Sequence, residues 1–331
     1  MPPNRRKILY LRHASEDIYR MIRAEVPSGF ELVTLDGDSE AERLAKIADA
    51  QVVIVSSHRL SRALIEAAGA LELVHHQGVG YHDTVDVEAL RERALPLALT
   101  TAGTIESVAE HTVLLVLAAL RRLTFADAEL RRGRWRNNSV RAVARDLAGR
   151  TIGYVGMGRI GQAVARLLRA FGTEGLYFDP VAVLADEAAA ALGLRPVSFD
   201  ELLAQADVVT LHVPLTPRTH HLIDAAALAR MKPDAVLVNT ARGPVVDEGA
   251  LGEALRAGRL GAAALDVFDP EPPPPDHPLY DLPNVVLTPH TAASTRDALG
   301  AKMAALMANL VRFYDGKPLE NPVELDTEAP E

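Results

Sequence analysis

Three residues with complementary chemistry each follow a short apolar run in the second half of the chain. They are Arg242, Glu271 and His290, placed after the runs 236–239, 261–265 and 285–288. A guanidinium can hold a carboxylate and polarise the carbonyl beside it, and a histidine can give a proton to a developing alkoxide or remove it. A carboxylate beside that histidine would orient the ring and favour its protonated form. Together these groups indicate hydride transfer to or from a 2-oxo acid, although each residue alone also fits a surface or core role.

A glycine-rich segment, TIGYVGMGRIG, indicates the cofactor for such a transfer. Gly156, Gly158 and Gly161 have G-x-G-x-x-G spacing between an apolar run and a helical pattern. The first glycine allows a tight turn, the second a close approach to a pyrophosphate, and the third close packing of helix on strand. Asp179 follows the next apolar run, where a carboxylate would accept hydrogen bonds from ribose hydroxyls and repel the 2′-phosphate of NADP. The pattern predicts NAD, the alternative being a plain turn with Asp179 as a strand-end cap.

The elements that must position these residues form two series of β-rich runs alternating with helical patterns. In the first series, strands are expected at 7–11, 31–35, 51–55, 71–74 and 97–99, and helices at 38–49 and 61–68. In the second, strands are expected at 151–155, 175–178, 208–212, 235–239, 261–265 and 285–288, and a helix at 160–171. This alternation is typical of parallel sheets covered by helices, in which ligands bind at the carboxyl ends of the strands. We therefore expect an α/β protein with two Rossmann-like domains.

Four other segments complete the expected organisation. A long helix from Ile105 to Arg132 would bridge the domains, and a last helix would run from Ser294 to Tyr314. The Pro-rich segment 269–283 is expected to be an ordered loop, and the polar, acidic tail from Lys317 to be frayed. Because a complete α/β series precedes the glycine fingerprint, the nucleotide domain is expected to be inserted into another domain that the chain re-enters near its end.

Composition excludes several classes of protein. The 331 residues are 48% hydrophobic and 24% charged, as in ordinary globular proteins. The longest apolar stretch, Thr112–Leu120, is far shorter than the roughly 20 residues of a membrane span. Without cysteine, disulfides and thiolate chemistry are excluded, which fits a cytoplasmic location.

Net charge argues against nucleic acid as a partner. The chain carries a net charge of −9, but the segment Arg121–Arg150 has nine arginines and three acidic residues. These arginines have little aromatic interleaving for stacking bases, so we expect a solvated or subunit-contact surface there.

Several motifs are similar to those of one enzyme family. The sequence resembles the D-isomer-specific 2-hydroxyacid dehydrogenase family in the segments VGMGRIG with Asp179, HVPLTPRT (His212–Thr219), VNTARGPVVDEGAL (Val238–Leu251), AALDVFDPEP (Ala263–Pro272) and NVVLTPHTA (Asn284–Ala292). The resemblance spans most of the chain. It implies an NAD-dependent enzyme that interconverts a 2-oxo acid and a D-2-hydroxy acid, with an NAD-binding Rossmann domain inserted into a flavodoxin-like substrate domain. No metal is implied, because nicotinamide itself carries the hydride.

The resemblance also implies roles for individual residues. Arg242, Glu271 and His290 would be catalytic, with Arg242 and His290 also contacting substrate. Besides the three glycines and Asp179, the implied cofactor contacts are Arg159, Ile160, His212, Pro214, Thr219, Thr240, Ala241, Asp266 and Thr112. Pro214 and Thr219 also fit a plain turn.

The resemblance assigns the domains and the assembly. Residues 1–102 and 293–331 would bind substrate, and residues 103–292 would bind NAD. In the first domain, the backbone N–H groups of Val79 and Gly80 would hold the substrate carboxylate, since glycine allows the main chain to approach a ligand closely. The loop has one residue more than the usual spacing before Asp86. A homodimer is implied, with the helix 105–132 in the contact and Trp135 in the interface.

The sequence leaves the substrate and one other class of function open. Glyoxylate or hydroxypyruvate reductase and 3-phosphoglycerate dehydrogenase are the main candidates. Related formate and phosphite dehydrogenases are less favoured, because site residues expected of them are not found. Some relatives are NAD(H)-sensing corepressors that bind partner peptides and keep much of the triad. Turnover of small oxo acids would separate an enzyme from such a binding protein.

Overall fold

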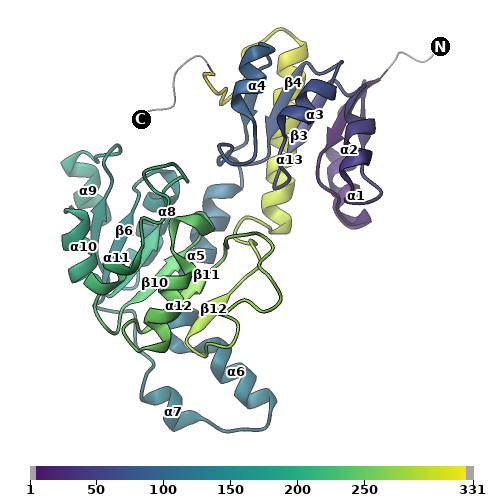
Figure 1. Cartoon of the computed structure of the whole chain (residues 1–331). Coiled ribbons are helices and arrows are strands. Elements are labelled where there is room, and N and C mark those ends of the chain that lie inside the picture. The colour runs from purple at the N-terminus through teal and green to yellow at the C-terminus, as the bar shows by residue number, and fades with distance from the viewer. Residues whose placement is uncertain (1–4, 326–331) are drawn as a thin grey trace. The chain divides into compact units, whose positions relative to one another are not determined.

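The computed structural model describes residues 5–325, and its backbone forms two parallel sheets (Figure 1). In this range one sheet has five strands in the order β2-β1-β3-β4-β5, and the other has seven in the order β12-β11-β10-β9-β6-β7-β8. The chain divides into two compact units. Unit 1 comprises the described residues up to Thr104 and from Thr295 on, and unit 2 is Ile105–Ser294. The prediction of an α/β protein with two parallel sheets, one domain inserted in the other, is confirmed.

Unit 1 holds the five-stranded sheet and the helices on its two faces. Its strands are β1 (Arg6–Tyr10), β2 (Phe30–Val33), β3 (Val52–Val55), β4 (Leu73–His76) and β5 (Leu97–Leu99). Its helices are α1 (Glu16–Glu25), α2 (Glu40–Ile47), α3 (Arg62–Ala67), α4 (Val87–Glu92) and α13 (Arg296–Tyr314).

The strands of unit 1 are buried on both faces because helices cover both. Ile8 and Tyr10 of β1 lie in the core formed with α1 and α13, whereas Leu9 of the same strand lies in the core formed with α2, α3 and α4. Side chains alternate between the faces of a strand. A strand that is covered on both sides therefore has a continuous apolar sequence. The strands of unit 1 were predicted from such runs.

Unit 2 holds the seven-stranded sheet. Its strands are β6 (Thr151–Val155), β7 (Glu174–Phe178), β8 (Leu194–Pro196), β9 (Val208–Leu211), β10 (Val236–Asn239), β11 (Ala262–Leu265) and β12 (Val285–Leu287). Its helices are α5 (Thr104–Arg121), α6 (Leu123–Arg131), α7 (Asn137–Arg141), α8 (Arg159–Arg169), α9 (Asp186–Leu192), α10 (Phe199–Gln205), α11 (Ala225–Arg230) and α12 (Glu248–Arg256), with a 3₁₀ turn η1 at Gly243–Val245.

The strand order of unit 2 reverses between β6 and β9, which are hydrogen-bonded neighbours. From β6 the chain runs outward through β7 and β8, and then returns to β9 on the other side of β6. In open parallel sheets, ligands bind outside the carboxyl ends of the strands at such a reversal. We therefore expect the ligand-binding residues of unit 2 on the loops that follow β6, β7 and β9 through β12.

The expected single helix from Ile105 to Arg132 is wrong. The structure has two helices, α5 and α6, separated at Arg122, whose backbone is left-handed with φ of 54°. The Nη2 atom of Arg122 donates to the carbonyl oxygen of Gly261, 2.7 Å away. One left-handed residue ends a right-handed helix, so the chain changes direction there and α6 begins anew.

The tail from Lys317 to Leu325 is not frayed, contrary to expectation. Leu99 N–H donates to the carbonyl of Asn321 at 3.0 Å, and Val323 N–H to the carbonyl of Leu97 at 2.8 Å. These bonds form an antiparallel bridge on the edge strand β5. The tail thereby covers an edge that would otherwise present unpaired backbone groups. Between residues 5 and 325, no helix has the length and apolar character needed to cross a membrane.

Candidate active site

The catalytic candidates of unit 2 follow three neighbouring strands whose last residues are in register. Arg242 follows β10, Glu271 lies on the loop after β11, and His290 follows β12. The final residues of β10 and β11 are paired, and so are those of β11 and β12. Because the strands are parallel, the three loops leave the same edge of the sheet.

His290 and Glu271 are joined directly. Nδ1 of His290 lies 2.7 Å from Oε2 of Glu271, and the two side chains are 42% and 35% exposed. The other carboxylate oxygen of Glu271 accepts a hydrogen bond from the backbone N–H of Phe268 at 3.1 Å. With Nδ1 held by a carboxylate, Nε2 is the ring nitrogen that can serve a substrate.

The backbone of His290 is left-handed, with φ of 51°, and Asp266 holds it there. His290 N–H donates to the carbonyl of Asp266 at 2.7 Å. The carboxylate of Asp266 accepts from the Thr288 hydroxyl at 2.6 Å and from the backbone N–H groups of Thr291 and Ala292, each at 2.8 Å. A non-glycine residue keeps a positive φ only where its surroundings fix it. Asp266 therefore shapes the loop that presents the imidazole.

His111 on α5 also contacts this loop and was missed from the sequence. Its Nε2 lies 3.0 Å from the Thr288 hydroxyl and 3.4 Å from a carboxylate oxygen of Asp266. Burial acts to raise the pKa of Asp266, but hydrogen bonds, first among them that of His111, lower it overall. The signal was present, since His111 directly precedes Thr112, one of the predicted cofactor contacts.

The turn that carries Arg242 is fixed by Asn239. The side chain of Asn239 donates to the carbonyl of Arg242 at 2.8 Å and accepts from Ala241 N–H at 3.0 Å. A Cβ on Gly243 would collide with the carbonyl of Phe268, so this turn packs directly against the segment that leads to Glu271. The Arg242 side chain is half-buried and donates to the carbonyl of Ala241 at 2.9 Å.

The glycine-rich turn lies at the reversal of strand order. Gly156 directly follows β6 with φ of 96°, and a Cβ there would lie 2.6 Å from the carbonyl oxygen of His212, which follows β9. A Cβ on Gly161 would collide with the carbonyl of Gly156. The first and third glycines are therefore required by the packing of α8 and β9 against the turn, as the fingerprint predicts.

Gly158 has a different surrounding. A Cβ built on it meets no protein atom within 4 Å, so the space beside it is open at the first turn of α8. Arg159, which begins the helix, is exposed, and Ile160 is half-buried. A helix N-terminus with bare backbone and open space suits the pyrophosphate of a dinucleotide, so these residues fit the predicted group.

Asp179 connects the glycine-rich turn to the loop after β7. One carboxylate oxygen accepts from Met157 N–H at 2.7 Å, and the other from Val181 and Ala182 N–H, each at 2.8 Å. The predicted ribose ligand is thus held at the carboxyl end of β7, beside the turn. Its carboxylate also has a structural role as the acceptor for three backbone groups.

His212, Pro214 and Thr219 lie on one loop after β9. The Thr219 hydroxyl donates to the carbonyl of Pro214 at 2.6 Å and accepts from Thr216 N–H at 2.7 Å, which closes the turn. Nε2 of His212 lies 3.1 Å from the hydroxyl of Thr210, and desolvation lowers the pKa of His212 to about 3. The imidazole of His212 is therefore neutral at physiological pH.

Thr112 of α5 and Thr240 after β10 lie together. Their hydroxyls are 3.0 Å apart, and the Thr112 hydroxyl also donates to the carbonyl of Val108 at 2.7 Å. Thr112 is fully buried, whereas Thr240 and its neighbour Ala241 are half-buried. Of these three predicted cofactor contacts, Thr240 and Ala241 are therefore the more accessible.

In unit 1, Val79 and Gly80 lie on the loop after β4. Val79 is exposed and Gly80 half-buried. The Thr84 hydroxyl donates to the carbonyl of Gly80 at 3.3 Å and lies 3.0 Å from Nε2 of His76. The loop is therefore closed on itself at the carboxyl end of β4, with Val79 facing solvent.

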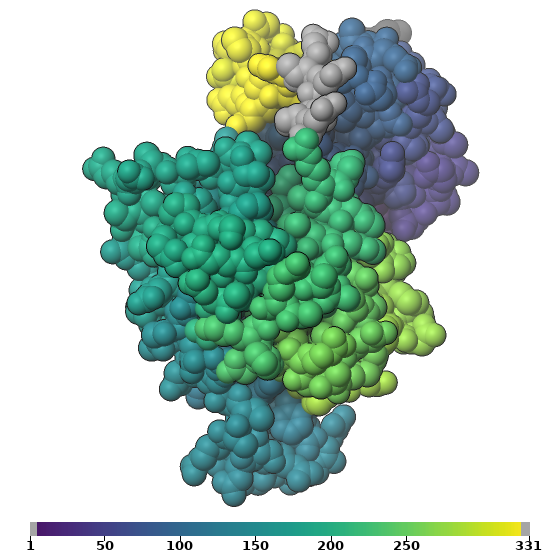
Figure 2. All heavy atoms as spheres, turned by 60° about the vertical axis from the view of Figure 1, so that its left-hand side comes forward, coloured from purple at the N-terminus to yellow at the C-terminus, as the bar shows by residue number. Residues whose placement is uncertain are grey.

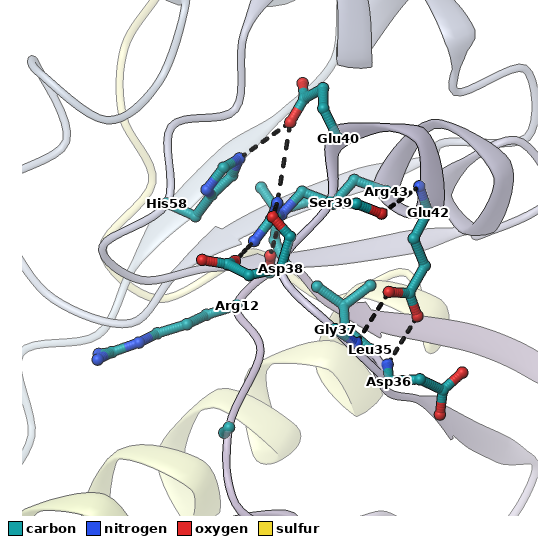
Figure 3. Close-up of polar contacts among 12 residues, drawn as sticks. Arg12, Leu35, Asp36, Gly37, Asp38, Ser39, Glu40, Glu42, Arg43 and His58 are labelled. Atoms are coloured by element: carbon teal, nitrogen blue, oxygen red, sulfur yellow. Dashed lines mark hydrogen bonds and ion pairs between the residues drawn. The ribbon is translucent and has the colours of Figure 1, made fainter.

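A charged cluster orders the carboxyl ends of β1 and β2 in unit 1 (Figure 3). The buried Arg43 donates to the carbonyl of Leu11 at 3.1 Å and pairs with the carboxylate of Asp38, whose pKa it lowers. Nε2 of His58, in the loop after β3, lies 3.4 Å from a carboxylate oxygen of Glu40. The cluster joins three loops, and Figure 3 shows the Arg12 side chain extending away from it. Nothing in the local sequence pattern distinguished Arg43 from a surface arginine.

Among the described side chains of both units, no three His, Asp or Glu residues gather in a way that could hold a metal ion.

Comparison with known proteins decides the family. Residues 113–292 match the family described as "D-isomer specific 2-hydroxyacid dehydrogenase, NAD binding domain". The chain belongs to the D-isomer specific 2-hydroxyacid dehydrogenase family. The resemblance inferred from the motifs is confirmed, and so is the prediction that the glycine-rich turn belongs to an NAD-binding domain.

Individual relatives differ in what they are named for. A D-3-phosphoglycerate dehydrogenase from Archaeoglobus fulgidus is 37% identical over 325 residues, which cover 98% of this chain and 60% of that protein. A glyoxylate reductase from Korarchaeum cryptofilum is 42% identical over 257 residues, covering 77% and 76%. A crystal structure of NAD-dependent formate dehydrogenase from Staphylococcus aureus in complex with NAD is 32% identical, with a TM-score of 0.84 and coverage of 96% and 98%. The chain thus spans about 60% of the length of the phosphoglycerate dehydrogenase relative.

Proposed function

We propose that this protein is an NAD-dependent D-2-hydroxyacid dehydrogenase. The observation that carries the proposal is the hydrogen-bonded pair of His290 and Glu271, with Arg242 on the neighbouring loop of the same sheet edge. An imidazole oriented by a carboxylate is a proton donor and acceptor, and a guanidinium holds a carboxylate. Both groups follow strands of the unit whose glycine-rich turn suits a dinucleotide.

The residues divide the chemistry between them. Arg242 binds the carboxylate of the 2-oxo acid and polarises its carbonyl. When bound, reduced nicotinamide supplies a hydride to carbon 2. His290 donates a proton from Nε2 to the oxygen on that carbon, which completes the 2-hydroxy acid. In the opposite direction His290 removes this proton. Glu271 keeps the ring oriented through its hydrogen bond to Nδ1.

The cofactor is proposed to lie along the carboxyl edge of unit 2. Gly156, Gly158 and the first turn of α8 would receive the pyrophosphate, with Arg159 and Ile160 beside it. Asp179 would accept hydrogen bonds from the ribose hydroxyls. Supporting residues on the later loops are His212, Pro214, Thr219, Thr240, Ala241, Asp266 and Thr112.

Unit 1 is proposed as the substrate-binding domain. Its loop after β4 would offer the backbone N–H groups of Val79 and Gly80 to the substrate carboxylate. The names of the relatives indicate two substrate classes, glyoxylate and the phosphorylated 3-phosphoglycerate type. Hydroxypyruvate is a short oxo acid of the same class as glyoxylate.

We also propose a homodimer formed through the lobe of unit 2 that contains α6 and α7 (Figure 2). Leu123 and Leu130 of α6 are 52% and 59% exposed, and Trp135 is 79% exposed. Large exposed apolar side chains gathered on one lobe are typical of an interaction surface. Replacing Leu130 by Glu would convert a dimer into a monomer in light scattering. A monomeric wild-type protein would refute this part. The compartment proposed is the cytoplasm.

Three arginines of this lobe share one buried glutamate. Glu129, buried in the lobe, accepts from Arg134, Arg136 and Arg132, and these bonds lower its pKa to about 2. These three arginines are therefore oriented by one carboxylate rather than arrayed for phosphates, which supports the expectation of a subunit contact over nucleic acid.

Turnover of a panel of 2-oxo acids tests the proposed activity. Glyoxylate, hydroxypyruvate, phosphohydroxypyruvate, pyruvate and bulkier oxo acids would each be mixed with the protein and NADH, and loss of NADH absorbance followed. We expect at least one acid to be reduced with NADH preferred over NADPH. Binding of NADH without turnover of any acid would favour a sensing protein instead.

A further inference from the structure

A buried pair outside the proposed triad, Glu248 and His277, anchors the Pro-rich loop 269–283 that carries Glu271. Glu248 is the first residue of α12, and His277 lies just past the middle of the loop. Nε2 of His277 is 2.7 Å from Oε2 of Glu248, and the two side chains are only 6% and 10% exposed. A buried carboxylate has to be satisfied by donors, because desolvation of an unpaired charge is costly.

The second oxygen of Glu248 is used at the start of the loop. Oε1 accepts from the backbone N–H of Asp269 at 3.0 Å. The preceding backbone N–H, that of Phe268, donates to Oε1 of Glu271 at 3.1 Å. Two consecutive N–H groups are therefore held by two different carboxylates, and the free oxygen of Glu271 meets Nδ1 of His290. A continuous series of hydrogen bonds leads from Glu248 through this backbone to the imidazole.

The ring of His277 is itself fixed. Its Nδ1 accepts from the backbone N–H of Leu279 at 3.4 Å, so that Nε2 carries the proton donated to Glu248. Phe268 and Tyr280 pack on the ring, with centroid distances of 6.0 and 5.4 Å. His277 thus fills an apolar site with one donor directed at one carboxylate. The other charged group that acts on Glu248 is Asp269.

We propose that Glu248 and His277 are positioning residues for the proposed proton donor. They hold the start and the middle of the Glu271 loop at one carboxylate, and so set the orientation of Glu271 and the tautomer of His290. The inference rests on the proposed function, because it assigns a catalytic purpose to this anchoring. Neither residue contacts reacting atoms. Both act through the backbone at 268–269.

Three variants and one control test the proposal. Glu248→Ala removes both acceptors, Glu248→Gln keeps one for Asp269 N–H, and His277→Phe keeps the aromatic packing but removes the donor. The matched control is Glu253→Gln, an exposed glutamate on the same helix. We expect kcat for oxo acid reduction to fall about 10-fold or more in Glu248→Ala, less in the other two and not in the control, since small displacements of a catalytic group are costly. KM for NADH should stay near wild type in all four.

A spectroscopic readout separates positioning from a loss of fold. The imidazole ¹⁵N shifts of His290, measured at a pH where the ring is neutral, report which nitrogen carries the proton. The wild-type protein should show the Nδ1–H tautomer, as its bond to Glu271 requires. In Glu248→Ala and His277→Phe, the Nε2–H tautomer should gain population while the far-UV circular dichroism is unchanged.

The outcomes distinguish this inference from the proposed function. If the wild-type protein reduces no oxo acid, the proposed function fails, and the tautomer measurement still decides whether the pair positions His290. If the wild-type protein is active but Glu248→Ala and His277→Phe retain its kcat and the His290 spectrum, the pair is a structural anchor only and the inference is overturned. Reduced kcat with an unchanged His290 spectrum would also overturn it, because the effect would then arise elsewhere.

Discussion

Nδ1 of His290 and the carboxylate of Glu271 are hydrogen-bonded at 2.7 Å, although 18 residues separate them in the sequence. Each residue belongs to a loop that follows one of two adjacent parallel strands, β11 and β12. The backbone N–H of Phe268 donates a hydrogen bond to the other carboxylate oxygen of Glu271, and the carbonyl of Asp266 accepts one from the backbone N–H of His290. The pair is therefore held in place by contacts of the protein itself, which is the condition for efficient proton transfer.

Replacing His290 by Gln should remove the proton donor without disturbing the cofactor. We expect kcat for oxo acid reduction to fall by about 10²–10⁴-fold, the usual contribution of a positioned acid–base group, while the Kd for NADH, measured by fluorescence, changes little. Glu271→Gln should lower kcat less, because the amide oxygen still accepts from Nδ1. Wild-type turnover in His290→Gln would remove His290 from its proposed role.

Arg242 should be intolerant of replacement by lysine. The planar guanidinium binds a carboxylate through two parallel hydrogen bonds, whereas an ammonium is a point charge. We expect Arg242→Lys to raise the KM for the oxo acid about 10-fold or more, with NADH binding preserved. Arg259→Lys, at an exposed position of unit 2, provides the control. Equal KM values for the variant and the wild type would exclude a substrate-clamping role.

Asp179 should determine the choice between NADH and NADPH through its charge. A carboxylate accepts from ribose hydroxyls and repels a 2′-phosphate. Asp179→Asn removes this charge while an amide oxygen remains for the N–H groups of Val181 and Ala182. Asp179→Arg also supplies a cation but loses those acceptors. We expect the ratio of kcat/KM for NADPH to that for NADH to rise in the order wild type, Asn, Arg. A ratio that is constant across the three would show that Asp179 has only its structural role.

Much of this arrangement could be predicted because parallel sheets relate sequence to space simply. A buried parallel strand reads as an apolar run, and whatever follows it lies at the ligand-binding edge. Arg242, Glu271 and His290 were found by this rule. The glycine spacing predicted the turn after β6 for a similar reason, since a side chain at Gly156 or Gly161 would collide with the backbone there.

The features that could not be predicted depend on single long-range contacts. The break between α5 and α6 occurs at Arg122, an ordinary helix former whose guanidinium bonds the carbonyl of Gly261. The tail from Lys317 looked loose because its pairing partner, β5, lies more than 200 residues earlier. The pair of Glu248 and His277 lacks any local signal too, because glutamate usually faces solvent and histidine is of intermediate burial.

His75 should make the protein sensitive to mild acid. It is buried on β4, with Nε2 3.0 Å from the side-chain amide nitrogen of Asn309, which also donates to the carbonyl of Glu320 at 3.0 Å. An amide donor requires Nε2 to be unprotonated. Desolvation lowers the pKa of His75 to about 4, below the ordinary histidine value of about 6.5. The unfolded chain therefore takes up a proton at a higher pH than the folded one.

The sign of the effect follows from linkage. Because the folded pKa is the lower one, the stabilisation is complete above the unfolded pKa and is lost as the pH falls through about 6.5 towards 4. Between pH 7 and pH 5 the free energy of unfolding should drop by about 2 kcal/mol on account of His75. In His75→Gln, this dependence should be smaller, while His212, whose pKa is also lowered by desolvation, still contributes some. Urea unfolding of both proteins at several pH values measures the difference, with the exposed His13→Gln as control. The same loss of stability in His75→Gln as in the wild type would show that His75 is not the group being protonated.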